Sequence, residues 1–192
     1  MLEYEKKFLL QRSEYECLKN HKFCKGNAVR QINYYYDTED FDYDYKGITC
    51  RIREKNGQFV ATVKEHKTGG SDCSIERSRF VNNEADTVLF RGMGVTFQGK
   101  LVTDRIVTEP VNGVKVMLDH NIYLETEDFE LEIEYEPDKE HEATEVEGIL
   151  ARHLGFDPKT HGIGFLWDKI GRVSNKSHRF FSHYRELKAI RR

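Results

Sequence analysis

The first residues of the chain carry charged side chains at the spacing of one face of a β-strand. Glu3, Glu5 and Lys7 alternate with apolar residues such as Tyr4 and Phe8. Because residues two apart in an extended chain point to the same side, two carboxylates and an ammonium share a face. Carboxylates at this spacing can hold a hard divalent cation, and an ammonium beside them can contact phosphate as a point charge.

A second acidic row stands late in the chain. Glu130, Glu132, Glu134 and Glu136 occupy every second position of a strand-like segment. Like charges gathered on one face of a sheet repel one another, so something cationic should compensate this row. The compensating charges could be the basic residues of neighbouring strands, or divalent metal ions such as Mg²⁺ and Mn²⁺.

Basic residues show the same alternation in the middle of the chain. Arg51 and Arg53 share one face, and Lys64 and Arg105 follow in later strand-like segments. The forked donors of arginine and the ammonium of lysine could together hold a chain of phosphates. The sequence has neither a Walker loop nor a visible serine or cysteine nucleophile with its base. Phosphoryl chemistry would therefore be metal-assisted attack by water.

A simpler interpretation of each charged face has to be weighed against this one. An antiparallel sheet commonly packs its apolar face on a core and turns its polar face to water. For a single strand that interpretation is the better one. The sorting of charge by sign argues against it, because a solvated face normally mixes acids with bases.

The elements that must position these residues follow from local patterns. Ser13 with Glu16 predicts an N-capped helix to about residue 20, and Asn56-Gly57 predicts a type I′ turn between two strands of a hairpin. Gly155 predicts the end of a helix. The segment 165–187 is ambiguous between helix and strand. The strands are expected near 31–37, 48–55, 58–67, 73–81, 99–109, 113–125 and 129–136, besides the first, with helices at 83–92 and 140–154.

Composition and charge limit the number of domains and the classes of partner to be expected. With 192 residues, 38% hydrophobic and 33% charged, the chain is expected to form one domain over residues 1–192. A net charge of −3 argues against the broad basic surface that nucleic-acid binding needs. The sequence shows no apolar run of membrane-spanning length and no signal peptide, which predicts a cytoplasmic protein without a membrane partner. A homodimer is left open.

These residues, in this order, resemble the CYTH family, also called triphosphate tunnel metalloenzymes, and in particular its bacterial triphosphatases. The family signature ExExK stands here as Glu3, Glu5 and Lys7. The resemblance extends from residue 3 to about residue 179. The other matching stretches are "YYDT" at 35–38, "RIR" at 51–53, "TVK" at 62–64, "ER" at 76–77, Arg105, "LD" at 118–119 and the late Glu-x-Glu-x-Glu strand.

The resemblance implies an α+β fold, a closed antiparallel β-barrel of about eight strands that forms a tunnel, with helices packed outside. The charged faces would then turn inward. The carboxylates implied to bind one or two Mg²⁺ or Mn²⁺ ions are Glu3, Glu5, Glu130, Glu132 and Glu134. The side chains implied to bind the triphosphate are Lys7, Arg51, Arg53, Lys64, Arg105, Lys176 and Arg179, the last two by a loose match.

The same resemblance implies roles in catalysis. Lys7, Glu132 and Glu134 are the catalytic candidates. Glu76 is a candidate for a further tunnel acid, against the alternative of a surface residue, and Asp119 is a candidate for orienting another residue rather than binding metal.

The resemblance implies metal-dependent hydrolysis of a small-molecule triphosphate. Inorganic tripolyphosphate, thiamine triphosphate and nucleoside triphosphates are all candidate substrates. The alternatives are a class IV-type adenylate cyclase and a non-catalytic module that binds polyphosphate or nucleotide.

Overall fold

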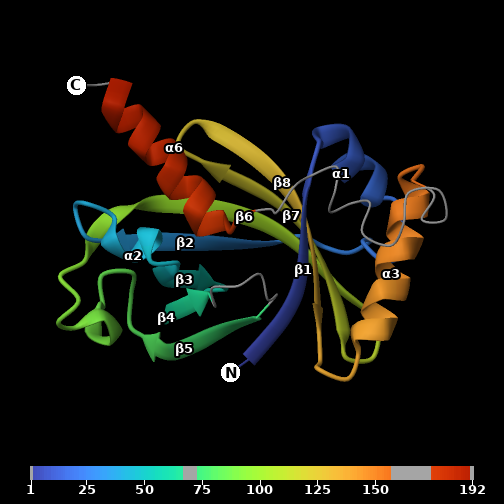
Figure 1. The fold of residues 1–192 in the computed structure, drawn as a ribbon, viewed down its shortest axis with the longest axis horizontal. Coiled ribbons are helices and arrows are strands. Elements are labelled where there is room, and N and C mark those ends of the chain that lie inside the picture. Colours follow the sequence, from blue (N-terminus) through green and yellow to red (C-terminus); the bar gives the residue numbers. More distant parts are fainter. Residues whose placement is uncertain (1, 67–72, 157–173, 191–192) are drawn as a thin grey trace.

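The computed structural model describes residues 2–66, 73–156 and 174–190 (Figure 1). The strands are β1 (Leu2–Leu10), β2 (Val29–Asp37), β3 (Ile48–Lys55), β4 (Gln58–His66), β5 (Cys73–Val81), β6 (Thr96–Val111), β7 (Val114–Tyr123) and β8 (Thr126–Tyr135). The helices are α1 (Arg12–Leu18), α2 (Asp42–Tyr45), α3 (Glu140–His153) and α6 (Lys176–Ile190), with a 3₁₀ turn at Val88–Phe90. None of these described helices combines the length and apolar content that a bilayer crossing requires.

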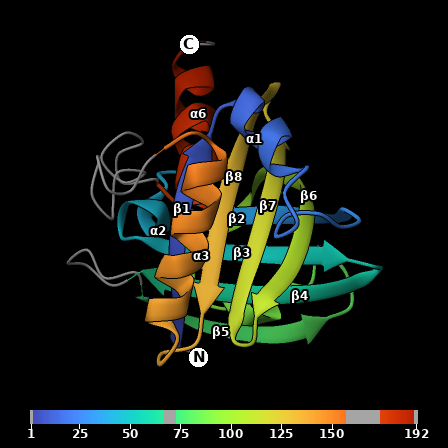
Figure 2. The ribbon, with the colours of Figure 1, turned by 90° about the vertical axis from the view of Figure 1, so that its right-hand side faces the viewer.

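The eight strands form a closed barrel in the order β1-β5-β4-β3-β2-β6-β7-β8. Every neighbouring pair is antiparallel, and a short ladder from Leu2–Ile75 to Tyr4–Cys73 closes the barrel between β1 and β5. Figure 2 shows β3, β4 and β5 running across the direction of β1, β7 and β8. The expectation of an eight-stranded antiparallel barrel is confirmed.

The hairpin between β3 and β4 has the predicted turn. Asn56 has φ of 52° and Gly57 has φ of 73°, the two positive values that a type I′ turn requires. The flanking register, from Lys55–Gln58 to Ile48–Glu65, holds without interruption. This turn therefore sets which residues of β3 and β4 share the inner face of the barrel.

The main apolar core lies outside the barrel, between the strands and two helices. Figure 2 shows α1 and α3 covering the outer side of β1, β7 and β8. Phe8, Leu131 and Ile133 are buried there against Leu18 and Val146. Full burial of each such side chain contributes roughly 1.5–3 kcal/mol. The apolar face of β1 thus packs outward, as the alternation predicts.

Lys6 is a charged residue on this outer, apolar face. Its ammonium lies 2.9 Å from a carboxylate oxygen of Glu147 and donates a hydrogen bond to Thr144 Oγ1 at 2.8 Å. Both charged side chains are almost completely buried. The pair therefore links β1 to α3 through an ion pair whose two charged groups are both buried.

Two predicted helices differ from the structure. Helix α1 begins one residue before Ser13, because Glu14 accepts a hydrogen bond from the backbone N–H of Gln11 at 2.7 Å and makes Gln11 the capping residue. The helix expected at 83–92 is only the 3₁₀ turn Val88–Phe90. Asn83 accepts the backbone N–H of Ala85 at 2.9 Å, a local bond that favours a turn over a helix.

The ambiguous last segment is helical from Lys176 onward, and residues 165–173 lie outside the described part. Phe180 and Phe181 of α6 are buried against Tyr35 and Leu101, whose side chains face the inside of the barrel. Gly99 makes room for this contact. A Cβ at Gly99, where φ is 151°, would lie 2.7 Å from the ring of Phe180. Helix α6 thus packs against inward-facing residues, while α1 and α3 pack outside.

Candidate active site

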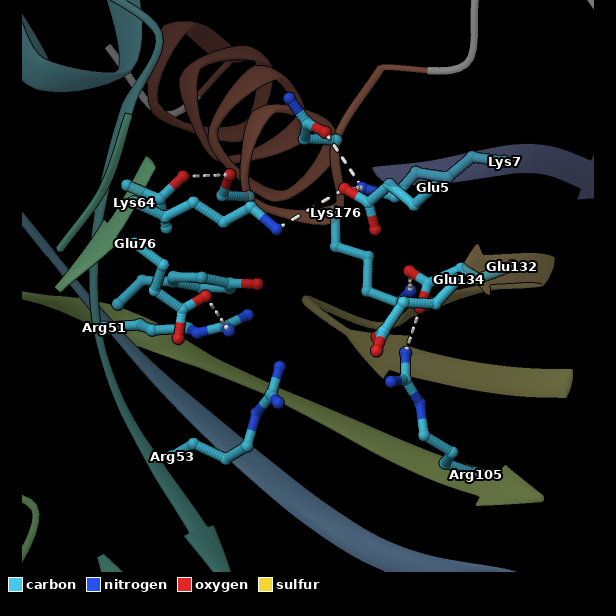
Figure 3. A pocket seen from close by; sticks show the side chains of 14 residues that line it. Glu5, Lys7, Arg51, Arg53, Lys64, Glu76, Arg105, Glu132, Glu134 and Lys176 are labelled. Carbon is cyan, nitrogen blue, oxygen red and sulfur yellow. Dashed lines mark hydrogen bonds and ion pairs between the residues drawn. The ribbon is translucent and has the colours of Figure 1, made fainter. Parts of the chain in front are cut away.

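A cavity lies inside the barrel, where the charged faces of the strands meet (Figure 3). It is lined from β1, β2, β3, β4, β5, β6 and β8 and from the beginning of α6. The lining residues are Glu5, Lys7, Tyr35, Thr49, Arg51, Arg53, Lys64, Glu76, Arg105, Glu132, Glu134, Asn175, Lys176 and Ser177.

The acidic side of the cavity is built by the pairing of β1 with β8. Glu5 stands directly opposite Glu134, and Lys7 stands opposite Glu132. The period of two then turns all four side chains inward. The structure therefore brings together the predicted residues of the first and the late strands. The side chain of Glu3 lies outside the described residues.

The basic side is built by β3 and β4. Arg51, Arg53 and Lys64 face the cavity, and Figure 3 shows them across it from Glu5 and Glu134. Carboxylates of β1 and β8 therefore face cations of β3 and β4 across a space, although each group of side chains also contains residues of the other sign, such as Lys7 and Glu76. A ligand that is anionic and accompanied by a cation matches this arrangement.

Glu76 is a tunnel-side residue rather than a surface residue. It stands opposite Lys64 in the β4–β5 ladder and lines the cavity. Its carboxylate lies 3.7 Å from Arg51. Burial by itself would raise the pKa of Glu76, but the charge of Arg51 together with the hydrogen bond from Ser78 and the charges of Lys64 and Arg53 outweighs it, and the pKa is lowered. Glu76 is thus ionised at neutral pH and holds Arg51 in the cavity wall.

Glu5 and Glu132 are ionised although they are buried. Glu5 lies 2.6 Å from the ammonium of Lys7 and 3.4 Å from that of Lys64. Burial alone would raise the pKa of Glu5, yet the two lysines lower it. Against the same effect of burial, Arg105 and Lys176 hold the pKa of Glu132 well below its usual range, each at 2.5 Å.

Asp119 orients a basic residue, as the sequence suggested. It is completely buried, and its two oxygens accept hydrogen bonds from Arg105 Nε at 2.7 Å and Nη2 at 2.5 Å. Lys176 lies 2.8 Å from the same carboxylate. This bidentate contact fixes the guanidinium of Arg105 at the cavity edge.

Glu130 has the inward parity of β8, but neither it nor Arg179 of α6 is among the described residues that line the cavity. Glu130 is completely buried and contacts Lys176 at 3.0 Å as well as Arg179. Burial raises the pKa of Glu130, with the neighbouring Glu132 adding to the effect, against the opposing charge of Lys176. Arg179 also lies 2.8 Å from Asp128. These contacts attach α6 to β8 through residues that are not part of the cavity lining.

Arg53 differs from the other basic residues of the cavity. Within the described part of the chain it has no carboxylate partner, and its Nε donates to Asn33 Oδ1 at 2.9 Å. Burial, together with the charges of Arg51 and Arg105, lowers the pKa of Arg53 to about 9. The guanidinium is still charged at neutral pH, and an anion in the cavity would stabilise it.

The carboxylates of the cavity fit Mg²⁺ or Mn²⁺ in their chemistry, since both ions prefer oxygen ligands. Among the described residues, however, no three acidic, histidine or cysteine side chains are gathered closely enough to hold a metal ion by themselves. Mg²⁺ commonly uses only one or two protein carboxylates and takes its remaining ligands from substrate phosphates and water. Glu5 and Glu134, directly paired on adjacent strands, can supply those carboxylates.

Some cavity residues were not predicted as site residues. Tyr35 belongs to the "YYDT" stretch, and strand alternation from Arg51, its partner in the β2–β3 ladder, could have placed it inside. Asn175 and Ser177 had no local signal. They reach the cavity only because α6 packs against the inside of the barrel, where Ser177 Oγ lies 2.7 Å from Thr49 Oγ1.

Comparisons with known proteins agree with this geometry. The family model of the CYTH domain matches residues 1–161. A Bacillus subtilis (strain 168) protein named "Putative triphosphatase YjbK" is 29% identical over 147 residues, which cover 69% of this chain and 77% of that protein.

Two solved structures share the fold. One is described as a putative adenylate cyclase from Bacillus halodurans, with a TM-score of 0.65, 24% identity, and coverage of 93% of this chain and 97% of that one. The other is HpAC1 from Hippeastrum, described as a putative adenylyl cyclase with a dominant triphosphatase activity. Its TM-score is 0.63 at 19% identity, with 95% of each chain covered.

Proposed function

The chain belongs to the CYTH domain family, and from this membership and the geometry of its cavity we propose that it is a Mg²⁺- or Mn²⁺-dependent triphosphatase. The proposed reaction is hydrolysis of a phosphoanhydride bond in inorganic tripolyphosphate or a small organic triphosphate. The observation that carries the proposal is that one cavity brings the carboxylates of Glu5 and Glu134 opposite the basic side chains of Arg51, Arg53 and Lys64. A simple anion-binding module gains nothing from acids stacked beside its ligand.

The basic side is proposed to bind the phosphate chain. Among the described residues Arg53 has no carboxylate partner, and Arg51 on β3 and Lys64 on β4, opposite Thr49, line the same cavity. Arginine can donate two parallel hydrogen bonds to one phosphate. Lys7 faces the same space from β1 and would contact the phosphate nearest the acidic side.

The acidic side is proposed to hold the metal through Glu5 and Glu134. Bound there, the ion would neutralise phosphate charge and lower the pKa of water. In hydrolysis, a bond forms between the water oxygen and phosphorus while the phosphoanhydride P–O bond breaks, and the water proton must pass to a base. Glu132 is a weak base because Arg105 and Lys176 hold its pKa low. Because Glu134 is engaged as a metal ligand in this proposal, solvent water would take the proton.

Release of phosphate from tripolyphosphate with Mg²⁺ or Mn²⁺ tests the proposal. Wild-type protein should turn over the substrate, and Glu134→Gln should reduce kcat by roughly 10²-fold or more. Glu136→Gln, one residue past the end of β8 and not among the residues that line the cavity, serves as the matched control. If wild type binds tripolyphosphate tightly but leaves it intact, the chain is a binding module and the enzyme proposal is wrong.

The cyclase alternative is supported by the description of the Bacillus halodurans structure as a putative adenylate cyclase. A cyclase would convert ATP into cyclic AMP and pyrophosphate, whereas a triphosphatase would release phosphate. Chromatography of the products from ATP therefore separates the two activities. Cyclic AMP as the main product would replace the hydrolase proposal.

A further inference from the structure

Three consecutive tyrosines in β2 have different surroundings. Tyr34 donates its hydroxyl hydrogen to Glu54 at 2.9 Å, and Tyr36 donates to the backbone carbonyl of Glu84. Both of these side chains lie on the outer face of the barrel. Tyr35 lies on the opposite face and lines the cavity.

The ring of Tyr35 is held firmly. It is only 1% exposed and packs against Phe180 and Phe181 of α6, with ring centroids 5.0 Å and 5.8 Å away. Within residues 2–66, 73–156 and 174–190 its hydroxyl has no hydrogen-bond partner. Because Tyr35 lines the cavity, this donor is available to an acceptor bound there.

The surroundings of Tyr35 indicate which acceptor. The basic groups Arg51, Arg53, Lys176 and Arg179 are close enough to act on its phenol electrostatically, and Arg51 is its direct partner in the β2–β3 ladder. Arg51 Nε is itself buried and has no hydrogen-bond partner in the described part of the chain. Burial raises the pKa of Tyr35, so the phenol keeps its proton at neutral pH. A phosphate drawn in by these cations would bring acceptor oxygens.

We propose that Tyr35 is a substrate-binding residue whose hydroxyl donates a hydrogen bond to a phosphate oxygen of the triphosphate, beside Arg51 and Arg53. This inference rests on the proposed function and adds a neutral donor to the basic side of the cavity. Tyr35→Phe removes the hydroxyl alone and keeps the ring against Phe180.

The test measures binding of tripolyphosphate by calorimetry without divalent metal, and KM with metal. Tyr35→Phe should weaken binding and raise KM by about tenfold, because a hydrogen bond to a charged group is lost. Tyr34→Phe and Tyr36→Phe are matched controls and should stay within about twofold of wild type, since their hydroxyls donate outside the cavity.

A tyrosine absorbance difference spectrum provides a second readout. It should appear on adding tripolyphosphate to wild type, Tyr34→Phe and Tyr36→Phe, and be absent in Tyr35→Phe. If wild type binds and hydrolyses tripolyphosphate and Tyr35→Phe does so equally well, the inference is wrong while the proposed function stands. If wild type neither binds nor hydrolyses it, the proposed function itself fails.

Discussion

The ammonium of Lys176 lies 2.5 Å from a carboxylate oxygen of Glu132. It also lies 2.8 Å from Asp119 and 3.0 Å from Glu130. One cation from α6 therefore compensates three buried acids of β7 and β8. This contact links the position of the helix to the charge of the cavity, and it leads to the first prediction.

Replacing Lys176 with Gln should leave those acids short of positive charge. We expect the variant to unfold at a lower temperature than wild type without metal, and to bind Mn²⁺ about tenfold more tightly in the absence of substrate. Calorimetric Mn²⁺ titration and thermal unfolding with and without Mn²⁺ check this. Lys139→Gln is the control, because Lys139 pairs with Glu142 on the surface of α3. Unchanged Mn²⁺ affinity in Lys176→Gln would show that Lys176 does not compete with metal.

Arg53 should matter for the ligand and not for the fold. Arg53→Met removes a buried charge that has no carboxylate partner among the described residues, so the unfolding temperature of the free protein should not fall. Tripolyphosphate affinity should fall by about 100-fold, as expected for lost hydrogen bonds between charged groups. Arg30→Met, an exposed position on the same strand pair, should change neither quantity. A large loss of stability in Arg53→Met would mean that the arginine is structural.

Asp128 should make the attachment of α6 depend on pH. Its contact with Arg179 is mostly buried, and against the effect of burial Arg179 lowers the pKa of Asp128. A carboxyl group with a lowered folded-state pKa stabilises the fold above its unfolded pKa of about 3.9 and loses that contribution as pH falls through the folded value. Asp128→Asn should therefore lower the free energy of unfolding by about 3 kcal/mol at pH 7.

The difference between Asp128→Asn and wild type should shrink as pH falls below about 4, because the unfolded wild-type chain then binds a proton at Asp128 before the folded protein does. Urea unfolding across this pH range measures it. Asp104→Asn, which breaks an exposed pair with Arg30, should have a much smaller effect. If the loss of unfolding free energy in Asp128→Asn did not change with pH, the electrostatic explanation would be wrong.

The buried pair of Lys6 and Glu147 should behave as a unit. Glu147→Ala strands a buried ammonium and should lower the free energy of unfolding by about 3 kcal/mol. Replacing both partners, as Lys6→Met with Glu147→Leu, should recover most of this loss, because no uncompensated charge is left. Glu142→Ala, on the exposed side of α3, is the control. If the double variant were less stable than Glu147→Ala alone, the pair would contribute more than charge compensation.

Much of the fold could be predicted because its signals are local. Alternation at Glu5 and Lys7 defines the two faces of β1, and Asn56-Gly57 defines a turn whose geometry sets the neighbouring register. The helix predicted at 83–92 failed for a local reason too. Asn83 bonds to a backbone N–H two residues away and makes a turn instead.

The candidate site likewise has a part that could be predicted from the sequence and a part that could not. The sequence by itself determined which side chains share a face, since the period of two is a property of each strand, and the order of Glu5, Arg51, Arg53, Lys64 and Glu134 identified the family. Only the tertiary structure decided which of these residues are available to a ligand. Glu130 has the parity of Glu134, yet α6 covers it through Lys176 and Arg179.

Tyr35 shows the same contrast between local pattern and tertiary contacts at a single residue. Local pattern makes it part of a strand, but the place of its hydroxyl in the cavity depends on the groups that barrel closure and α6 bring around it. Such contacts join residues more than a hundred positions apart, and no local spacing encodes them. Alternation along each strand therefore determined which side chains face inward, and the packing of α6 decided which of those still face the cavity.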